Sequence, residues 1–258
     1  MTTLQVLVPA RGDARFLATA LDSLRAQAFT AWQATLCPLD AAANAVAVEC
    51  AGADQRLQVA GTVGMAEADA LALAASTSSA AFLCVLDGDD ALAPGAFGTL
   101  LDALATDPAI GMAYSRHVLV DANSRVLGPG PLCELAYSAD ALLMDFMTGP
   151  LRIMRMQAYR DAGGHVGTHA DAIEYDLCLR LSETTGFVHV PQPLYRRRIH
   201  PLAPEVARWA EAIEARYAAF VDAVRRRGLD AQYDCALHID SWHILQPLRP
   251  FGGAGNWG

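Results

Sequence analysis

Short apolar runs alternate with segments of helical spacing along the first half of the chain. Residues 4–10 (LQVLVPA) form a run rich in β-branched residues, and comparable runs occupy residues 31–39, 56–61 and 81–86. Runs of this length and composition are typical of buried strands. The run at 81–86 is apolar throughout, as expected for a strand that helices cover on both faces.

Helices are predicted between these strands. The apolar residues of the segment 14–27 recur at helical spacing, namely Phe16, Leu17, Ala20, Leu21 and Leu24. Asp13 is placed to cap this helix. Residues 67–75 and 94–105 predict two further helices. This alternation predicts a doubly wound, mainly parallel α/β sheet, in which ligands bind beyond the carboxyl ends of the strands.

The second half is less regular and predicts a smaller antiparallel part. Residues 110–121 and 125–128 are expected to be antiparallel strands. Residues 148–165 predict a strand, a short helix and a Gly-Gly turn, and residues 171–186 predict a helix with one apolar stripe. Residues 187–201 (FVHVPQPLYRRRIHP) predict a strand that continues into an extended basic segment.

The C-terminal part predicts one amphipathic helix and a loose tail. Apolar residues alternate with charged ones from Pro204 to Arg227, and Gly228 ends the helix. The Gly-rich end of the chain is expected to be loosely held. We therefore expect one domain over residues 1–201 and a C-terminal extension over residues 202–258.

Composition and charge exclude several classes of protein. The 258 residues are 53% hydrophobic and carry a net charge of −9, which argues against nucleic-acid binding. All 19 basic residues are Arg, which we attribute to codon usage. The six cysteines show no C-x-x-C spacing, which favours reduced thiols in the cytoplasm over a zinc site.

No targeting or membrane-spanning segment is expected from the pattern. The N-terminus lacks a basic region followed by an apolar stretch, so we expect no signal peptide. Residues 70–86 are uncharged but mostly Ala, with Ser and Thr at 76–79, which makes a poor bilayer span. The protein is therefore expected to be cytoplasmic.

Three carboxylates follow the fourth predicted strand. Asp87, Asp89 and Asp90 come directly after the apolar run, with only Gly88 among them. A divalent cation relieves their repulsion, and Mg²⁺ and Mn²⁺ prefer carboxylate and phosphate oxygens. A metal held there can bridge a diphosphate and stabilise a departing nucleotide. The plainer alternative is that Asp89 or Asp90 caps the helix near Pro94 and the others are solvated.

Five motifs in order resemble the family 2 glycosyltransferases of the GT-A fold. They are VLVPARGD at 6–13, FLCVLDGDD at 82–90, AGGH at 162–165, IEYDLCLRL at 173–181 and YRRRIHP at 195–201. The family typically reads V-I-I-P-T-Y-N, L-D-S-D-D, G-G-F-D, E-D-Y-D-L-W-L-R-L and Y-R-x-H at these places. The resemblance spans roughly residues 4–201 and implies a GT-A-type sheet with a smaller antiparallel part and a C-terminal helical extension.

This resemblance implies an inverting, metal-dependent transfer of a sugar from a nucleotide-sugar donor. Asp87 and Asp89 would contact the ribose and the diphosphate bound to Mn²⁺ or Mg²⁺. Glu174 takes the place of the family's catalytic Asp, and a carboxylate there can deprotonate an acceptor hydroxyl. Asp176 is the second candidate, about 200° round the helix from Glu174. The plainer alternative for Glu174 is a solvated helix residue.

Other ligands are implied by the basic segment and by the loops after the first strands. Arg198 would donate to phosphate, and His200 would ligate the metal beside the aspartates. Pro9 and Arg11 belong to the first motif, on the donor side. Asp40 is the one acid left of the family's V-D-D-G-S motif, and it would contact the base or the ribose. The plainer alternative is a loop of exposed arginines with a satisfied histidine.

Departures from the family keep two other functions open. Arg11-Gly12 replaces the Tyr-Asn of the first motif. Asp69 stands where the family places a phosphate-facing Arg, and Arg11 is placed to compensate for the loss of that positive charge. These changes favour, as the alternative, a glycosyltransferase-like binding or scaffold protein. A nucleotidyltransferase is the third possibility, but the chain lacks the Gly-rich, Lys-containing loop usual near the first strand of such enzymes.

No motif identifies the acceptor. The resemblance is compatible with a glycan, a lipid-linked or a protein acceptor in bacterial surface glycan or glycoconjugate synthesis. We expect acceptor choice to depend on residues 115–168 and on the C-terminal helix. That helix, with Trp209, is expected to pack on the domain's own core. A homodimer face, or a lipid-proximal face that would place the protein at the inner membrane, are the alternatives.

Overall fold

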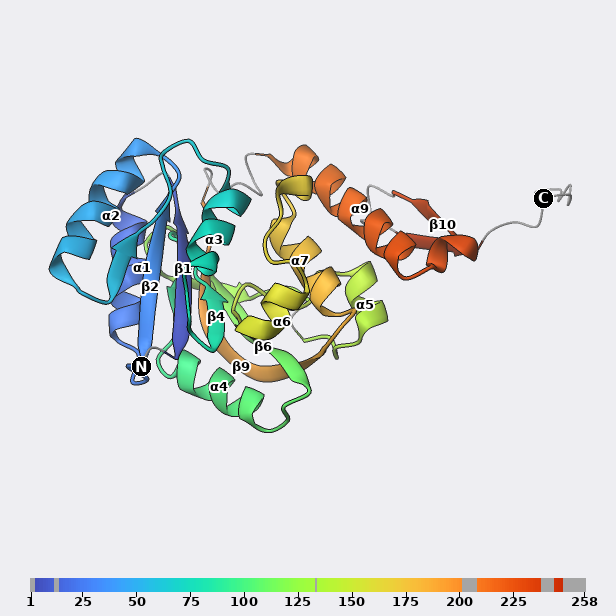
Figure 1. The fold of residues 1–258 in the computed structure, drawn as a ribbon, viewed down its shortest axis with the longest axis horizontal. Coiled ribbons are helices and arrows are strands. Elements are labelled where there is room, and N and C mark those ends of the chain that lie inside the picture. Colours follow the sequence, from blue (N-terminus) through green and yellow to red (C-terminus); the bar gives the residue numbers. More distant parts are fainter. Residues whose placement is uncertain (1–2, 12–13, 133, 201–207, 238–243, 248–258) are drawn as a thin grey trace, which may run out of the picture.

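One mixed β-sheet runs through the part of the chain that this computed structural model describes, which is residues 3–11, 14–132, 134–200, 208–237 and 244–247. Its strand order is β3-β2-β1-β4-β8-β6-β9-β5, with β7 paired to β6 (Figure 1). The four parallel strands are β1 (Leu4–Ala10), β2 (Trp32–Pro38), β3 (Leu57–Val59) and β4 (Phe82–Val85). The four apolar runs of the first half thus form the strands that they predicted.

The rest of the sheet is joined to these strands through β8. Strand β8 (Arg152–Arg155) is antiparallel to both β4 and β6 (Ile110–Val120). Strand β7 (Val126–Pro129) is also antiparallel to β6, whereas β9 (Gly186–Arg198) runs parallel to it. The expected antiparallel pairing of residues 110–121 is therefore right for β7 and β8 and wrong for β9.

Helices cover both faces of the sheet. One layer holds α1 (Ala14–Arg25), α2 (Ala41–Ala53) and α4 (Ala96–Ala105). The other layer holds α3 (Glu67–Ser76), α5 (Ala139–Met144), α6 (Met156–Asp161), α7 (Ile173–Leu181) and α9 (Trp209–Arg226). Alternate residues of β4 enter the two cores, with Leu83 in one and Cys84 in the other. Each fully buried Leu contributes about 1.5–3 kcal/mol, so both layers stabilise the strand ends that carry the site.

Helix α2 was not predicted from the sequence. Its residues, AAANAVAVECAGA, are small and apolar on every side, so they show no helical periodicity. Asp40 sets its start, because its carboxylate accepts the backbone N–H of Ala43 at 2.8 Å. Short elements without a sequence signal include β5 (Ala91–Leu92), α5 and the hairpin of β10 (Tyr233–Ala236) and β11 (Ile244–Pro247).

Strand β9 is longer than the sequence indicated. The sequence predicted an extended basic segment after the strand, and the plainer alternative, a loop of exposed arginines, is wrong for Tyr195 to Arg198. These residues continue the strand, with Arg196 paired to Ala91 of β5 and Arg198 paired to Val120 of β6. Two neighbouring strands therefore fix the backbone that leads to His200.

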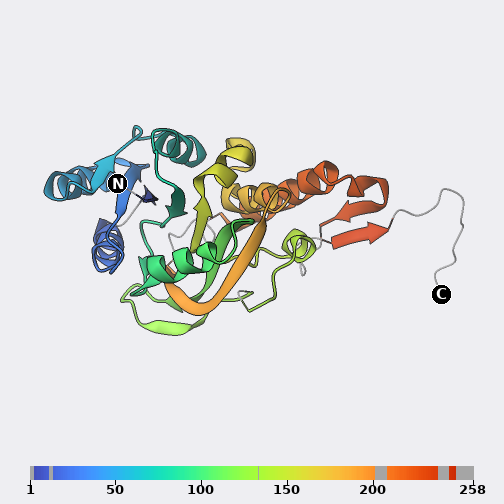
Figure 2. The same cartoon turned by 60° about the horizontal axis from the view of Figure 1, so that its bottom comes forward.

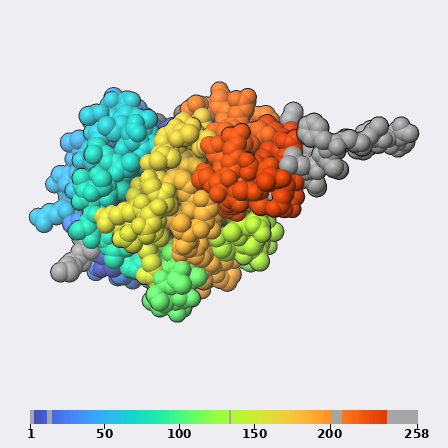
Figure 3. All heavy atoms as spheres, turned by 45° about the vertical axis from the view of Figure 1, so that its right-hand side comes forward, coloured from blue at the N-terminus to red at the C-terminus, as the bar shows by residue number. Residues whose placement is uncertain are grey.

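The C-terminal helix packs on the domain through one half of its length. Phe220 and Val224 are fully buried against the core that includes α5 and α7, as expected, whereas Trp209 is 54% exposed. The β10–β11 hairpin follows this helix and lies at the end of the molecule away from the N-terminal strands (Figures 1 and 2). Figure 3 shows the red C-terminal segment seated against the orange and yellow parts of the body. The expected domain boundary at residue 201 falls outside the described residues and stays a prediction.

Candidate active site at the carboxyl end of the sheet

The acidic loop, which comprises residues 87–90, lies directly against the end of β1. The backbone N–H of Gly88 donates to the carbonyl oxygen of Pro9 at 2.9 Å. A Cβ at Gly88 would stand 2.9 Å from that same oxygen and 3.1 Å from Ala10. Only glycine fits this approach, and the flanking Asp87 and Asp89 are therefore held at the carboxyl end of the parallel strands.

Asp90 is a structural residue of this loop. Its side chain is 4% exposed and accepts the backbone N–H of Arg198 at 2.6 Å. Burial and the neighbouring charges of Asp87 and Asp89 hold the pKa of Asp90 well above its ordinary value. The helix-cap alternative is wrong, because Gly95, in a left-handed conformation, precedes α4 and no side chain caps it.

The structure brings two of the expected metal ligands together. Asp89 Oδ2 and His200 Nε2 are 2.9 Å apart, and the Asp89 side chain is 26% exposed. This spacing suits one oxygen and one nitrogen ligand of a single divalent ion, each at about 2.0–2.2 Å from it. Within the described ranges no group of three or more His, Cys, Asp or Glu side chains has a metal-binding arrangement. Magnesium in such sites often has one or two protein carboxylates and takes its other ligands from substrate phosphates and water.

Arg198 holds the acidic loop in place through a hydrogen bond to its backbone. It is 2% exposed, and its guanidinium donates to the carbonyl oxygens of Asp89 at 2.7 Å and of Asp121 at 2.8 Å. The same guanidinium lies 4.6 Å from the centre of the Phe16 ring. Its donors are directed at protein oxygens, so contact with a phosphate would require an exchange of these partners. A role of Arg198 in donor binding therefore stays a prediction.

Glu174 is held by two buried side chains. Its Oε2 accepts from Arg152 Nη2 at 2.6 Å, and its Oε1 lies 2.8 Å from His165 Nε2. Burial alone would raise the pKa of Glu174, but Arg152 and His165 lower it to about 2. The side chain keeps 22% of its surface exposed, so the ionised carboxylate is accessible from one side. Glu174 is thus not the simple solvated helix residue of the plainer alternative.

Arg152 is affected by the charges of both this carboxylate and the acidic loop. Burial alone would lower the pKa of Arg152, but nearby anionic groups, Glu174 and Asp87 among them, raise it above its ordinary value. Burial and the charges of Asp90 and Asp87 likewise raise the pKa of Tyr195 well above its ordinary value. The Tyr195 hydroxyl also accepts the backbone N–H of Asp87 at 3.3 Å. Glu174 and the aspartates of the acidic loop therefore lie in one electrostatic environment.

Asp176 lies in a different environment from Glu174. Its carboxylate is buried and pairs with Arg180, one helical turn further on, at 2.8 Å. The Arg180 guanidinium also donates to the carbonyl oxygen of Ala162. The two carboxylates have no partner in common among these contacts, in agreement with their expected angular separation on the helix.

The donor-side residues have protein partners. Arg11 pairs with Glu67 at the start of α3, and both side chains are partly exposed. Asp40 caps α2, as described above, and lies at the end of β2. Pro9 is buried, and its carbonyl oxygen supports Gly88. The structure thus gives Pro9 and Asp40 structural contacts at the positions where donor contacts were expected.

Sequence reasoning missed four residues of this region. They are Glu67, Arg152, His165 and Tyr195. Arg152 had a signal, because it is the charged residue of the apolar run PLRIM that forms β8. His165 also had one, since it stands where the family typically has Phe after its Gly-Gly pair. Tyr195 heads the YRRRIHP motif, although no role was assigned to it, and Glu67 carries no pattern that distinguishes it from surface residues.

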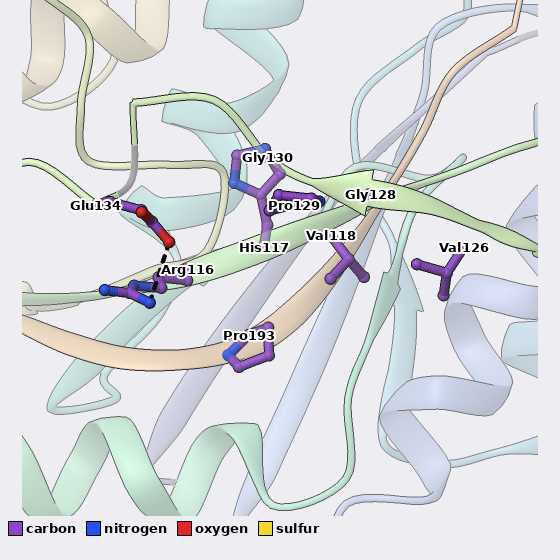
Figure 4. Close-up of a pocket in the computed structure, with 9 residues that line it drawn as sticks. All are labelled: Arg116, His117, Val118, Val126, Gly128, Pro129, Gly130, Glu134 and Pro193. Carbon is purple, nitrogen blue, oxygen red and sulfur yellow. Dashed lines mark ion pairs between the residues drawn. The ribbon is translucent and has the colours of Figure 1, made fainter.

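A cleft of about 310 Å³ lies elsewhere, between β6, β7 and β9 (Figure 4). Its lining is mostly apolar, and Arg116 and Glu134 form an ion pair of 3.2 Å across part of it. The His117 ring points toward Gly130, where a Cβ would lie 2.0 Å from its Nε2 atom. None of the predicted site residues lines this cleft, which falls mainly within the region expected to select the acceptor.

Comparison with known sequences finds two chondroitin synthases and a hyaluronan synthase among the similar proteins. A chondroitin synthase of Escherichia coli is 27% identical over 115 residues, which are 45% of this chain and 17% of that protein. A chondroitin synthase of Pasteurella multocida (strain Pm70) and a hyaluronan synthase of Pasteurella multocida are each 22% identical over 197 residues, 76% of this chain and 20% of each relative. The chain therefore spans at most about a fifth of the length of these relatives. No protein-family model matches the chain.

Solved structures share the fold. The mannosyltransferase PcManGT from Pyrobaculum calidifontis, in complex with GDP-Man and Mn²⁺, has a TM-score of 0.66 at 13% identity, over 86% of this chain and 64% of that one. TarS 1–349 from S. aureus, in complex with UDP-GlcNAc, has a TM-score of 0.64 at 13% identity, over 84% and 66% of the two chains. At these identities the likeness shows the fold alone.

The architecture is that of the GT-A-like α/β proteins, as the five sequence motifs predicted. The chain itself is a homologue of glycosyltransferases, and the expected resemblance to family 2 fits these relatives. Among the helices of the described residues, none combines the length and apolar character that a bilayer span requires.

Proposed function

We propose that the chain transfers a sugar from a nucleotide-sugar donor to a hydroxyl group of an acceptor, with inversion at the anomeric carbon. The observation that carries this proposal is the placement of two acidic groups at one end of the sheet. Asp87 and Asp89 follow β4, Glu174 begins α7, and the buried Arg152 responds to the charges of both Asp87 and Glu174. The homology to glycosyltransferases supports the same function.

A divalent ion fits the exposed side of the acidic loop. Asp89 and His200 would hold Mn²⁺ or Mg²⁺ through the two atoms that are 2.9 Å apart, with Asp87 beside them. Such an ion would neutralise the diphosphate and stabilise the leaving nucleotide. The Mn²⁺ in the PcManGT complex is consistent with this assignment. Arg198 would act here by fixing the loop that carries Asp89.

Glu174 would be the catalytic base. The hydroxyl oxygen of the acceptor forms the new bond to the anomeric carbon, while the bond from that carbon to the diphosphate breaks. The hydroxyl proton passes to Glu174, which is ionised at neutral pH. Because bond formation makes this proton strongly acidic, a carboxylate of low pKa can take it late in the step.

The donor side would be formed by the loops after β1 and β2. Arg11, Pro9 and Asp40 lie there, and Arg11 would offer its guanidinium to the donor in place of the missing Arg at position 69. We further propose that the reaction takes place in the cytoplasm. The described cysteines, Cys37, Cys50, Cys84, Cys178 and Cys235, are all free thiols, which supports a reducing compartment.

The experiment that tests this function is a donor screen with mass spectrometry. The protein is incubated with UDP-, GDP- and dTDP-sugars, Mn²⁺ and a panel of glycan acceptors, and glycosylated products are measured. Glu174→Gln should bind donor but lose transfer by at least about 100-fold. Glu49→Gln, at an exposed carboxylate on α2, is the matched control and should keep full activity. Full transfer by Glu174→Gln would remove Glu174 from its role.

A binding or scaffold protein is the second candidate. It is favoured because the donor-side residues already have partners within the protein: Arg11 pairs with Glu67, and Asp40 caps α2. In that case no nucleotide sugar would raise the melting temperature, with or without Mn²⁺. An active enzyme should gain about 2.7 kcal/mol at a donor concentration of 100 times its Kd.

A further inference from the structure

We propose that Tyr159, His165 and Arg152 form a positioning unit that fixes the carboxylate of Glu174 in one orientation. This inference rests on the proposed transfer for its catalytic meaning. The arrangement itself is a property of the fold and can be tested without activity.

The direction of the hydrogen bond to Glu174 follows from its carboxylate. An ionised carboxylate oxygen only accepts, so Nε2–H of His165 donates to Glu174 Oε1 at 2.8 Å. On the other side of the ring, the hydroxyl oxygen of Tyr159 accepts the backbone N–H of His165 at 3.1 Å, and this hydroxyl lies 3.0 Å from Nδ1. The His165 side chain is fully buried, and both of its nitrogens are engaged within the protein.

Arg152 secures the other carboxylate oxygen. Its Nη2 donates to Glu174 Oε2 at 2.6 Å, while its Nη1 donates to the carbonyl oxygen of Gly149 at 2.6 Å. Each oxygen of Glu174 thus has its own donor from a different element, β8 on one side and the segment after α6 on the other. The carboxylate cannot rotate without losing a charge-assisted bond.

The Gly-Gly turn after α6 is what lets this unit form. Gly163 and Gly164 both have positive φ angles, 83° and 65°, which turn the chain back so that His165 meets Tyr159. A Cβ at Gly164 would lie 3.0 Å from the Tyr159 ring and hydroxyl. The turn therefore gives the buried ring pair its close contact, and the pair in turn supplies a donor to Glu174.

In the transfer step these residues exchange no proton with the substrate. The acceptor proton moves to Glu174, the nucleoside diphosphate leaves, and His165 keeps its proton on Nε2. The contribution of the unit is alignment of the accepting oxygen, for which misplacement by about 1 Å can reduce a rate by about 100-fold. Tyr159, His165 and Arg152 are therefore positioning residues.

The test compares two replacements of His165. His165→Gln keeps an N–H donor near the position of Nε2, whereas His165→Leu removes it. We expect His165→Leu to lower kcat by about 10–100-fold with unchanged donor affinity, and His165→Gln to restore most of that loss. His169→Leu is the matched control, because His169 pairs with Asp222 at 3.0 Å through the same type of contact away from Glu174. It should leave kcat unchanged.

A spectroscopic readout separates the unit from the function. Nitrogen-15 NMR of the wild-type protein should show a proton on Nε2 of His165, and Glu174→Gln should change its chemical shift. This hydrogen bond together with no transfer from any donor would contradict the proposed function and leave the unit standing. A His165 without a proton on Nε2, or equal kcat values for His165→Leu and the wild type, would overturn the positioning unit.

Discussion

Gly88 is the residue on which the geometry of the acidic loop depends most directly. A methyl group at this position would meet the backbone of Pro9 and Ala10, which cannot move without disturbing β1. We expect Gly88→Ala to destabilise the protein by about 1–3 kcal/mol in urea unfolding. Gly98→Ala is the control, because Gly98 lies inside α4 with nothing within 4 Å of its added Cβ. That variant should be neutral or stabilised by about 0.5–1 kcal/mol. Equal losses in the two variants would contradict the tight approach at Gly88.

Glu174 should make stability depend on pH in a defined window. Its pKa in the folded protein, about 2, lies below the ordinary value of 4.5. Its ionised form therefore adds stability above pH 4.5, and this contribution is lost as the pH falls through about 2. Glu174→Gln should be roughly 3 kcal/mol less stable than the wild type at pH 7 and nearly equal to it at the low end of this window. A stability difference that stays constant between pH 7 and pH 3 would refute the ion pair with Arg152.

The three aspartates of the loop illustrate what single residues do not reveal. In the sequence they form one acidic cluster, which predicted a ligand site at the end of the strand. In the structure Asp89 faces His200 while Asp90 is buried under Arg198 and Tyr195. This difference depends on β9, which lies more than 100 residues further along the chain. No local pattern could have separated the two acids.

At the scale of elements, the sequence predicted those whose burial is periodic or continuous. Strands β1 to β4 are apolar runs between helices, and α1 carries a clear apolar stripe, so both kinds were found. Helix α2 is Ala-rich and has high helix propensity, but it carries no apolar stripe by which the sequence could show it. Strand β9 carries three consecutive arginines, for which a loop was the alternative. Pairing with β5 and β6 overrides that local polarity, so tertiary contacts determine the end of β9.

Helix α9 offers a prediction at this scale. Phe220 is fully buried in the core shared with α7, whereas Trp209 is exposed. Phe220→Ala should cost about 3–5 kcal/mol, and Trp209→Ala less than about 0.5 kcal/mol, in chemical denaturation. A large loss at Trp209 that depends on protein concentration would instead indicate the homodimer face. A negligible loss at Phe220 would show that the helix is not part of the domain core.

The whole molecule joins a parallel nucleotide-binding type of sheet to a second part built around β6 and β9. The five motifs predicted this architecture because each contributes to one end of the sheet. They did not predict the partners of Glu174. Arg152 on β8 and His165 in the turn after α6 reach Glu174 only because both segments pack against α7. The aligned part of the chain covers about a fifth of the length of each Pasteurella multocida relative, so this chain corresponds to one segment of them.

The central claim is that Asp89 and His200 hold a divalent ion that binds a sugar nucleotide. The most direct measurement is isothermal titration of UDP- and GDP-sugars into the wild-type protein and into Asp89→Ala, each with Mn²⁺ and with chelator. We predict donor binding that requires Mn²⁺ in the wild type and disappears in Asp89→Ala, while the melting temperature of the unliganded variant changes little. Donor binding of equal strength in chelator, or an unchanged response to Mn²⁺ in Asp89→Ala, would contradict the account.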